Sequence, residues 1–228
     1  TFFLIKSTPG QLSILADPTM SPTVVATIEK RFGLDRSPVE QYFLWMGNML
    51  RGDMGMSLVF GRPVLGMILD RLPATLVLGF TALLITVVIG IPAGVIAARR
   101  PNSFFDQVLS FLSVVALATP NFWLGILAII LFSVQLGWLP GSGMQTIGQP
   151  FSFVDRLSYL ILPAAVLATS TTAEIMRYTR SSWLDVLHQD YVRTARSKGL
   201  AEGAVHSKHI LKNALIPVLT ILGLSLPR

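Results

Sequence analysis

The chain contains no cysteine, so disulfide bonds, thiolate catalysis and cysteine-ligated metals are excluded. It also has no Gly-x-x-x-x-Gly-Lys-Ser/Thr segment, and therefore no P-loop for binding ATP. The patterns His-Glu-x-x-His and Gly-x-Ser-x-Gly are absent too, which weighs against a hydrolase. These absences turn attention from catalysis to the distribution of apolar residues.

Charged residues are scarce, at 13% of the 228 residues, against 52% for hydrophobic residues. The apolar residues are clustered, because residues 74–98 and 107–154 carry no charged side chain. A membrane crossing needs about 20 apolar residues in a helix. We therefore predict a multispanning all-α membrane protein. Its domain at 74–228 has spans at about 74–98, 107–134 and 157–176 and an incomplete span at 214–228.

Both ends of the chain fall inside apolar runs. Residues 1–7 are typical of the end of a first transmembrane helix, and the run from Ala214 reaches Arg228 after about 15 residues, which is short for a crossing. We expect the native protein to continue beyond both ends.

The basic residues indicate a topology. The net charge is +6, and the excess of Lys and Arg lies at 99–106 and 177–213. Because Lys and Arg are retained on the cytoplasmic side, these two segments are predicted to face inward. The regions 8–73 and 134–158 are then extracytoplasmic. Membrane topology and contact with lipid explain the basic charge, and no nucleic-acid partner is expected.

The region 8–73 is polar enough to lie in water and is predicted to be helical. A helix is expected over 38–50, where aromatic residues suit packing at a membrane interface. The run Arg51-Gly52-Asp53-Met54-Gly55-Met56-Ser57-Leu58 follows it and is typical of a glycine-rich turn.

The inward segment 177–213 is predicted to contain a helix–glycine–helix elbow. Residues 181–198 have helical periodicity, Gly199 is a helix-stop signal, and a second short helix is expected from Glu202 to about Lys212. Chemistry alone leaves two interpretations open: a shaped surface for a soluble partner, or a basic segment lying against anionic lipid headgroups.

The residue sequence of the elbow supports the first interpretation. Tyr-Val-Arg-Thr-Ala-Arg-Ser-Lys-Gly-Leu at 191–200, followed by His209 and the segment 212–217, resembles the cytoplasmic EAA loop of ATP-binding-cassette importers. The turn at 51–58 is similar to an RGDLGxSL segment of the same proteins. Arg193-Thr194-Ala195 replaces Glu-Ala-Ala, a departure typical of the dipeptide/oligopeptide/nickel permease family. The resemblance implies that ATPase coupling involves Tyr191, Arg193, Thr194, Ala195, Lys198, Gly199 and Leu200.

The resemblance further implies a pore-forming permease subunit in a prokaryotic plasma (inner) membrane. Its partners would be a homologous second permease subunit, two ATP-binding subunits and an extracytoplasmic solute-binding protein. ATP and Mg would be bound by the ATPase subunits, and no cofactor by this chain. The expected cargo is a di- or oligopeptide, with nickel or glutathione as alternatives. An intramembrane hydrolase and a non-transporting scaffold are the hypotheses from other classes.

Pro120 and Asn121 lie inside the second predicted span and are expected either to line a pathway or to form a kink packed on a neighbouring helix. Glu174 and Arg177 are expected to pair with each other or to reach headgroups. Trp183 is expected to be an interfacial anchor.

Overall fold

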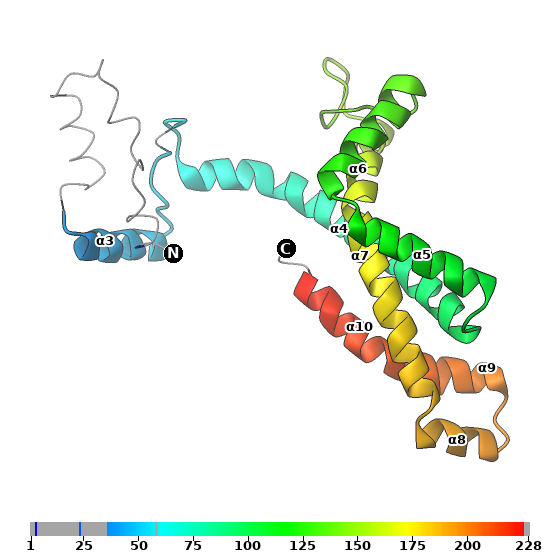
Figure 1. Cartoon of the computed structure of the whole chain (residues 1–228). Coiled ribbons are helices and arrows are strands. Elements are labelled where there is room, and N and C mark those ends of the chain that lie inside the picture. Colours follow the sequence, from blue (N-terminus) through cyan, green and yellow to red (C-terminus); the bar gives the residue numbers. More distant parts are fainter. Residues whose placement is uncertain (1–2, 4–22, 24–35, 58, 226–228) are drawn as a thin grey trace. The chain divides into compact units, whose positions relative to one another are not determined.

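The computed structural model describes residues 3, 23, 36–57 and 59–225 (Figure 1). The chain divides into two compact units, Thr1–Pro73 and Ala74–Arg228. The regular elements of the described residues are helices, together with one isolated bridge between Met56 and Pro63. The predicted all-α class is confirmed. The first predicted span at 1–7, except Phe3, and residues 8–35, except Thr23, lie outside the described residues.

Helix α3 spans Pro38–Leu50, as the sequence predicts. Ser37 begins it with a capping box: its hydroxyl accepts from the Glu40 backbone N–H, and the Glu40 carboxylate accepts from the backbone N–H of Ser37. Proline at the first helical position adds to this start signal. Strong local signals at the N-terminus explain why this boundary is readable without tertiary information.

Helix α4 spans Val64–Arg99 and begins ten residues before the predicted span. The division between the two units falls inside it. Its 36 residues are long and apolar enough to cross a membrane. The buried positions of its second half are small residues that recur at helical spacing: Ala82, Thr86, Gly90, Gly94, Ala97 and Ala98.

Gly90 and Gly94 bring α4 against α7 (Phe153–Leu187). A Cβ atom at Gly94 would lie 2.6 Å from the carbonyl oxygen of Met176 and 2.6 Å from Cβ of Thr179. Both obstacles are backbone or branch-point atoms, which cannot rotate away. The two helices therefore approach each other this closely only because position 94 has no side chain.

We expect Gly94→Ala to destabilise the protein by about 1–3 kcal/mol, the usual range for overpacking a core. The measurement is thermal unfolding of the detergent-solubilised protein. Gly79→Ala, in the same helix, is the matched control, because a Cβ there meets nothing within 4 Å. Equal unfolding temperatures for the two variants would show that α4 and α7 do not pack at Gly94.

The second predicted span is broken in the structure. Helix α5 spans Phe104–Ala118, and the next helical segment, α6 (Asn121–Ala128) continuing into the π-helix η1 (Ile129–Gln135), is bent from it by 101°. Thr119 adopts the extended conformation that a following proline favours, and Pro120 precedes α6 as its N-cap. The two pieces together are apolar and long enough for one crossing.

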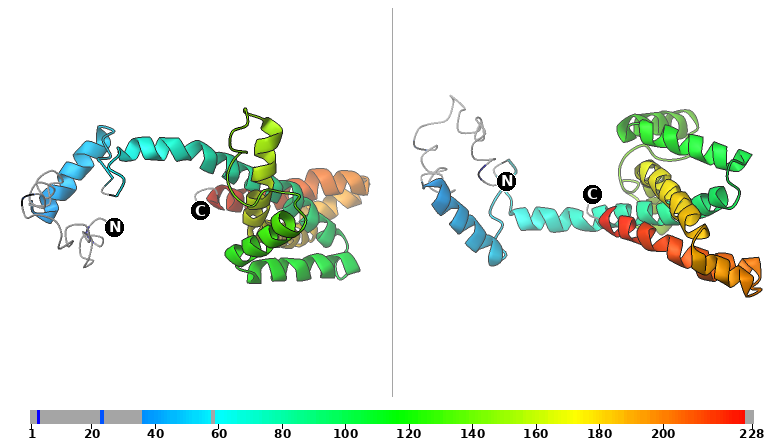
Figure 2. Two further views of the ribbon diagram at one scale, coloured as in Figure 1. Left: turned by 90° about the horizontal axis from the view of Figure 1, so that it is seen from above. Right: turned by 60° about the horizontal axis from the view of Figure 1, so that its bottom comes forward.

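Helix α7 is the central helix of the second unit. It packs against α5, α6 and α10 (Lys212–Ser225), and through Gly90 and Gly94 against α4 (Figures 1 and 2). Between α7 and α10 lie α8 (Asp190–Ser197), α9 (Glu202–Ala204) and the π-helix η2 (Val205–Leu211). These elements gather where α7 ends and α10 begins (Figure 2). The elbow predicted from the sequence is therefore attached directly to two long apolar helices.

Candidate functional site

The first arm of the elbow is not one helix over 181–198, so that prediction was wrong. Helix α7 ends at Leu187, and α8 begins at Asp190. Gln189 between them is extended, with φ −75° and ψ 147°. This break lets α8 turn back, so that Val192 and Ala195 reach the end of α7 and become buried. Burial of apolar side chains outweighs the helical propensity of the intervening residues.

An apolar cluster supports the elbow from behind. Trp183 on α7 is 2% exposed and packs with Val192 and Ala195 of α8, with η2 and with the start of α10. Its ring stacks on His206, with centroids 5.5 Å apart. The expectation that Trp183 anchors the protein at a membrane interface was therefore wrong. Its indole holds together the elbow and the two long helices.

Gly199 ends α8 in a Schellman motif. Its backbone N–H donates to the Arg196 carbonyl at 2.9 Å, and the N–H of Leu200 donates to the Ala195 carbonyl at 3.3 Å. Gly199 has φ +77°, which L-residues rarely adopt, and a Cβ there would meet no atom within 4 Å. Backbone conformation, and not crowding, is therefore what favours glycine at this position.

The second arm of the elbow is continuous with the following long helix. Helices α9, η2 and α10 follow one another from Glu202 to Ser225, so the separate short helix expected up to Lys212 is not formed. Glu202 links the arms: Arg196 donates to both carboxylate oxygens, from Nε at 2.9 Å and from Nη2 at 3.3 Å. The Arg196 guanidinium holds the pKa of Glu202 below its ordinary value. The ion pair is fully formed at pH values above the ordinary pKa of a glutamate. It is lost only as the pH falls through the lowered pKa of Glu202.

The predicted coupling residues fall into two groups. Tyr191, Arg193, Thr194, Lys198 and Leu200 are exposed, and they lie on α8 or beside the bend at Gly199 that follows it. Ala195 is 4% exposed and packs in the cluster below them. The structure thus leaves basic, hydroxyl and apolar side chains exposed along α8 and its end, and Ala195 is buried in the cluster beneath them.

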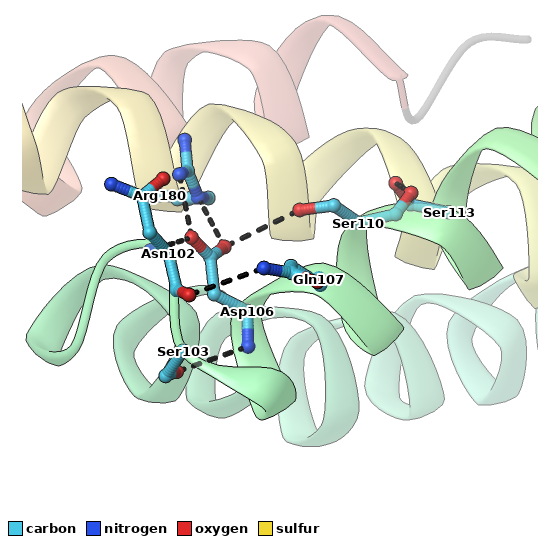
Figure 3. A network of polar contacts seen from close by, with 7 residues as sticks. All are labelled: Asn102, Ser103, Asp106, Gln107, Ser110, Ser113 and Arg180. Atoms are coloured by element: carbon cyan, nitrogen blue, oxygen red, sulfur yellow. Dashed lines mark hydrogen bonds and ion pairs between the residues drawn. The ribbon is translucent and has the colours of Figure 1, made fainter.

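Sequence reasoning missed an ion pair between α5 and α7. Arg180 Nε donates to Asp106 Oδ1 at 2.6 Å, and Arg180 Nη2 donates to Oδ2 at 2.8 Å (Figure 3). The Asp106 carboxylate also accepts from the Asn102 backbone N–H and from Ser110 Oγ, and its side chain is 3% exposed. Ser103 caps the same helix by accepting from the Asp106 N–H.

The only signal for this pair in the sequence is a carboxylate three residues after a serine cap at the start of an apolar run. The partner lies 74 residues further along the chain, so no local pattern indicates it. Arg180 is three residues before Trp183, and the pair therefore connects α5 to the helix that supports the elbow.

Pro120 and Asn121 lie at the bend between α5 and α6. Asn121 Oδ1 accepts a hydrogen bond from Ser170 Oγ of α7 at 2.8 Å, and the Asn121 residue remains exposed. The contact joins α6 to α7, as the packed-kink alternative expects. It also leaves a polar surface open beside the bend. Both alternatives for these residues are thus compatible with the geometry.

The chain is similar to known membrane transport proteins. Residues 90–228 match the family model described as "Binding-protein-dependent transport system inner membrane component". The oligopeptide transport system permease protein AppB of Bacillus subtilis (strain 168) is 45% identical over 229 residues, which cover 100% of this chain and 72% of the relative. The di/tripeptide transport system permease protein DppB of Pseudomonas aeruginosa (strain UCBPP-PA14) is 40% identical over 244 residues, which cover 98% and 73%. A putative peptide transport system permease protein of Brucella suis biovar 1 (strain 1330) is 44% identical over 226 residues, which cover 98% and 71%.

Proposed function

Because the chain belongs to the family of binding-protein-dependent transport system inner membrane components, we propose that it is the permease subunit of an ATP-driven peptide importer. The observation that carries this function is the similarity over nearly the whole chain to relatives named as peptide permeases. The elbow with its glycine bend and exposed basic surface supports it independently.

The proposed mechanism assigns mechanical coupling to this chain and ATP hydrolysis to its partners. Two ATP-binding subunits bind ATP and Mg. One of them contacts the exposed residues at and before the Gly199 bend, including Tyr191, Arg193 and Lys198. When the ATPase subunits close, α8 moves. The Trp183 cluster passes this movement to α7 and α10, because the same buried residues contact all three helices.

The remaining partners follow from the proposed topology. Segments 99–106 and 177–213 face the cytoplasm, and 8–73 faces outward, where it contributes to docking a solute-binding protein. A homologous second permease completes the pathway, which the bend at Pro120-Asn121 helps to line. The exposed apolar side chains of α4 and α5 contact lipid or that second subunit. The protein is then a multi-pass subunit of a prokaryotic inner membrane.

Uptake by reconstituted vesicles tests this function. The chain is co-expressed with the adjacent permease, ATPase and binding-protein genes, and the purified complex is placed in vesicles with ATP on the ATPase side. Import of radiolabelled trialanine that requires ATP supports the proposal. Import of nickel or glutathione in its place would assign another cargo. If the chain retains no ATPase on purification, the scaffold hypothesis is favoured. If the peptide is cleaved but not taken up, the hydrolase hypothesis is favoured.

Topology gives a separate prediction. The chain has no cysteine, so single cysteines at exposed Ser142 and Ser197 are the only thiols. An impermeant maleimide applied to intact cells should label Ser142→Cys alone, because Ser197 belongs to the Lys- and Arg-rich inward segment. Both sites should react in permeabilised cells, which controls for accessibility. Labelling of Ser197→Cys from outside would invert the topology.

A further inference from the structure

One side of α7 is left open by its neighbours. Helices α5, α6 and α10 and the glycines of α4 pack against other parts of it. The open side has residues spaced by three and four positions, which places them on one helical face. Ser170 and Glu174 are half-buried there, whereas Arg177, Tyr178 and Ser181 are exposed.

This open face differs from the other uncovered surfaces of the long helices. On α4 the exposed residues include Phe80, Leu84 and Val88, and on α5 they include Phe111 and Leu112. These apolar surfaces are suited to contact with lipid. Glu174 on this face lies within the predicted span 157–176, where a carboxylate is costly in hydrocarbon, and Arg177 lies at the cytoplasmic end of that span. The hydrogen bond from Ser170 to Asn121 brings a further polar group to the edge of the face. Contact with water or solute therefore suits Glu174 better than contact with lipid tails.

The charges on this face are unlike the nearby structural pair. Asp106 and Arg180 satisfy each other in a buried network (Figure 3). None of the ion pairs among the described residues involves Glu174 or Arg177, so of the two arrangements expected for these residues, pairing with each other is not formed. One negative and one positive group are thus held one turn apart on an open helix face and are free to meet a ligand.

We propose that Glu174 and Arg177 form a charge-selective subsite of the translocation pathway for zwitterionic peptides. Glu174 attracts the ammonium group of the passing peptide, and Arg177 attracts its carboxylate. This inference rests on the proposed function, since it requires that the chain lines a peptide pathway. It goes further in naming the residues that distinguish cargo by charge after the binding protein has released it.

The test compares three peptides in vesicles that contain the complete transporter: trialanine, trilysine and triglutamate. The binding protein is the same throughout, so a change in the relative uptake rates of the peptides isolates the permease. Because partly exposed ion pairs have a modest free energy, we expect Glu174→Gln to lower the trilysine-to-triglutamate uptake ratio by about fivefold. Arg177→Gln should raise this ratio, and Glu174→Asp should preserve it.

A merely structural role for Glu174 would reduce all three uptake rates equally, and that result would overturn the subsite. Loss of the second permease from the purified Glu174→Gln complex would also overturn it, because this face would then be a protein interface. In both cases ATP-dependent uptake of trialanine by the wild-type complex would leave the proposed function standing. A wild-type complex that imports none of the peptides would refute the proposed function itself.

Discussion

Replacing Gly199 with valine is expected to abolish peptide uptake while leaving membrane insertion intact. The residue has φ +77° in the Schellman motif that ends α8, and a β-branched side chain is strained there by about 1 kcal/mol or more. The strain is released by rotating the bend, which changes the direction in which α8 and α9 meet. The surface around Tyr191 and Lys198 would then no longer fit the ATPase. In vesicles, we expect the amount of solute transported per ATP hydrolysed to fall to background. We also expect less ATPase subunit to be retained by the purified complex.

Gly203→Val is the matched control. Gly203 lies in α9 without a positive φ, and a Cβ there also meets nothing within 4 Å. The two variants add the same side chain four residues apart, so a difference between them reports on the backbone conformation at Gly199. Wild-type uptake by Gly199→Val would show that the bend is not the coupling element. Contact of this basic loop with lipid headgroups would then be the better interpretation.

Removing the guanidinium of Arg180 is expected to have the largest effect on stability. Asp106 is 3% exposed, and Arg180 supplies two of its hydrogen bonds, at 2.6 and 2.8 Å. Arg180→Ala would leave a buried carboxylate without its counter-charge, which costs about 3 kcal/mol or more. For a chain of this size we expect the apparent Tm in detergent to fall by about 10 °C. Peptide transport should fall with it, because the pair joins α5 to the helix behind the elbow.

Two controls separate the destabilisation caused by leaving Asp106 unpaired from the stability that the ion pair itself contributes. Arg177→Ala, one turn away and exposed, should leave the Tm almost unchanged. The double variant Asp106→Leu/Arg180→Met removes both charges and should recover most of the lost stability, since apolar replacement of a buried pair is often neutral. A double variant as unstable as Arg180→Ala would mean that the damage comes from lost packing.

Much of the fold was readable from local pattern. The capping box at Ser37 and the proline after it mark the start of α3, and both the predicted start and the predicted end agree with the structure. The lysine- and arginine-rich stretch with its glycine likewise indicated a bend at position 199, which the structure has at φ +77°. Such signals act within one turn of the chain, so they need no tertiary information.

The errors arose where distant segments meet. Residues 181–198 have helical periodicity throughout, yet the helix breaks at Gln189 because α8 gains burial of Val192 by folding back. Trp183 resembles an interfacial anchor in the sequence, but α8 and η2 cover it. Asp106 and Arg180 are 74 residues apart, so only the packing of α5 on α7 reveals their contact.

The amino-acid sequence by itself determined that the chain enters a membrane as helices, because long uncharged runs leave the backbone no other way to satisfy its hydrogen bonds in hydrocarbon. It also determined the left-handed bend at Gly199, since that conformation is nearly free for glycine and strained for other residues. The tertiary structure alone decided which charges are satisfied and which remain open. Arg180 finds Asp106 while Glu174 and Arg177 stay on an uncovered face, because helix packing, and not sequence spacing, brings groups on different helices within hydrogen-bonding distance.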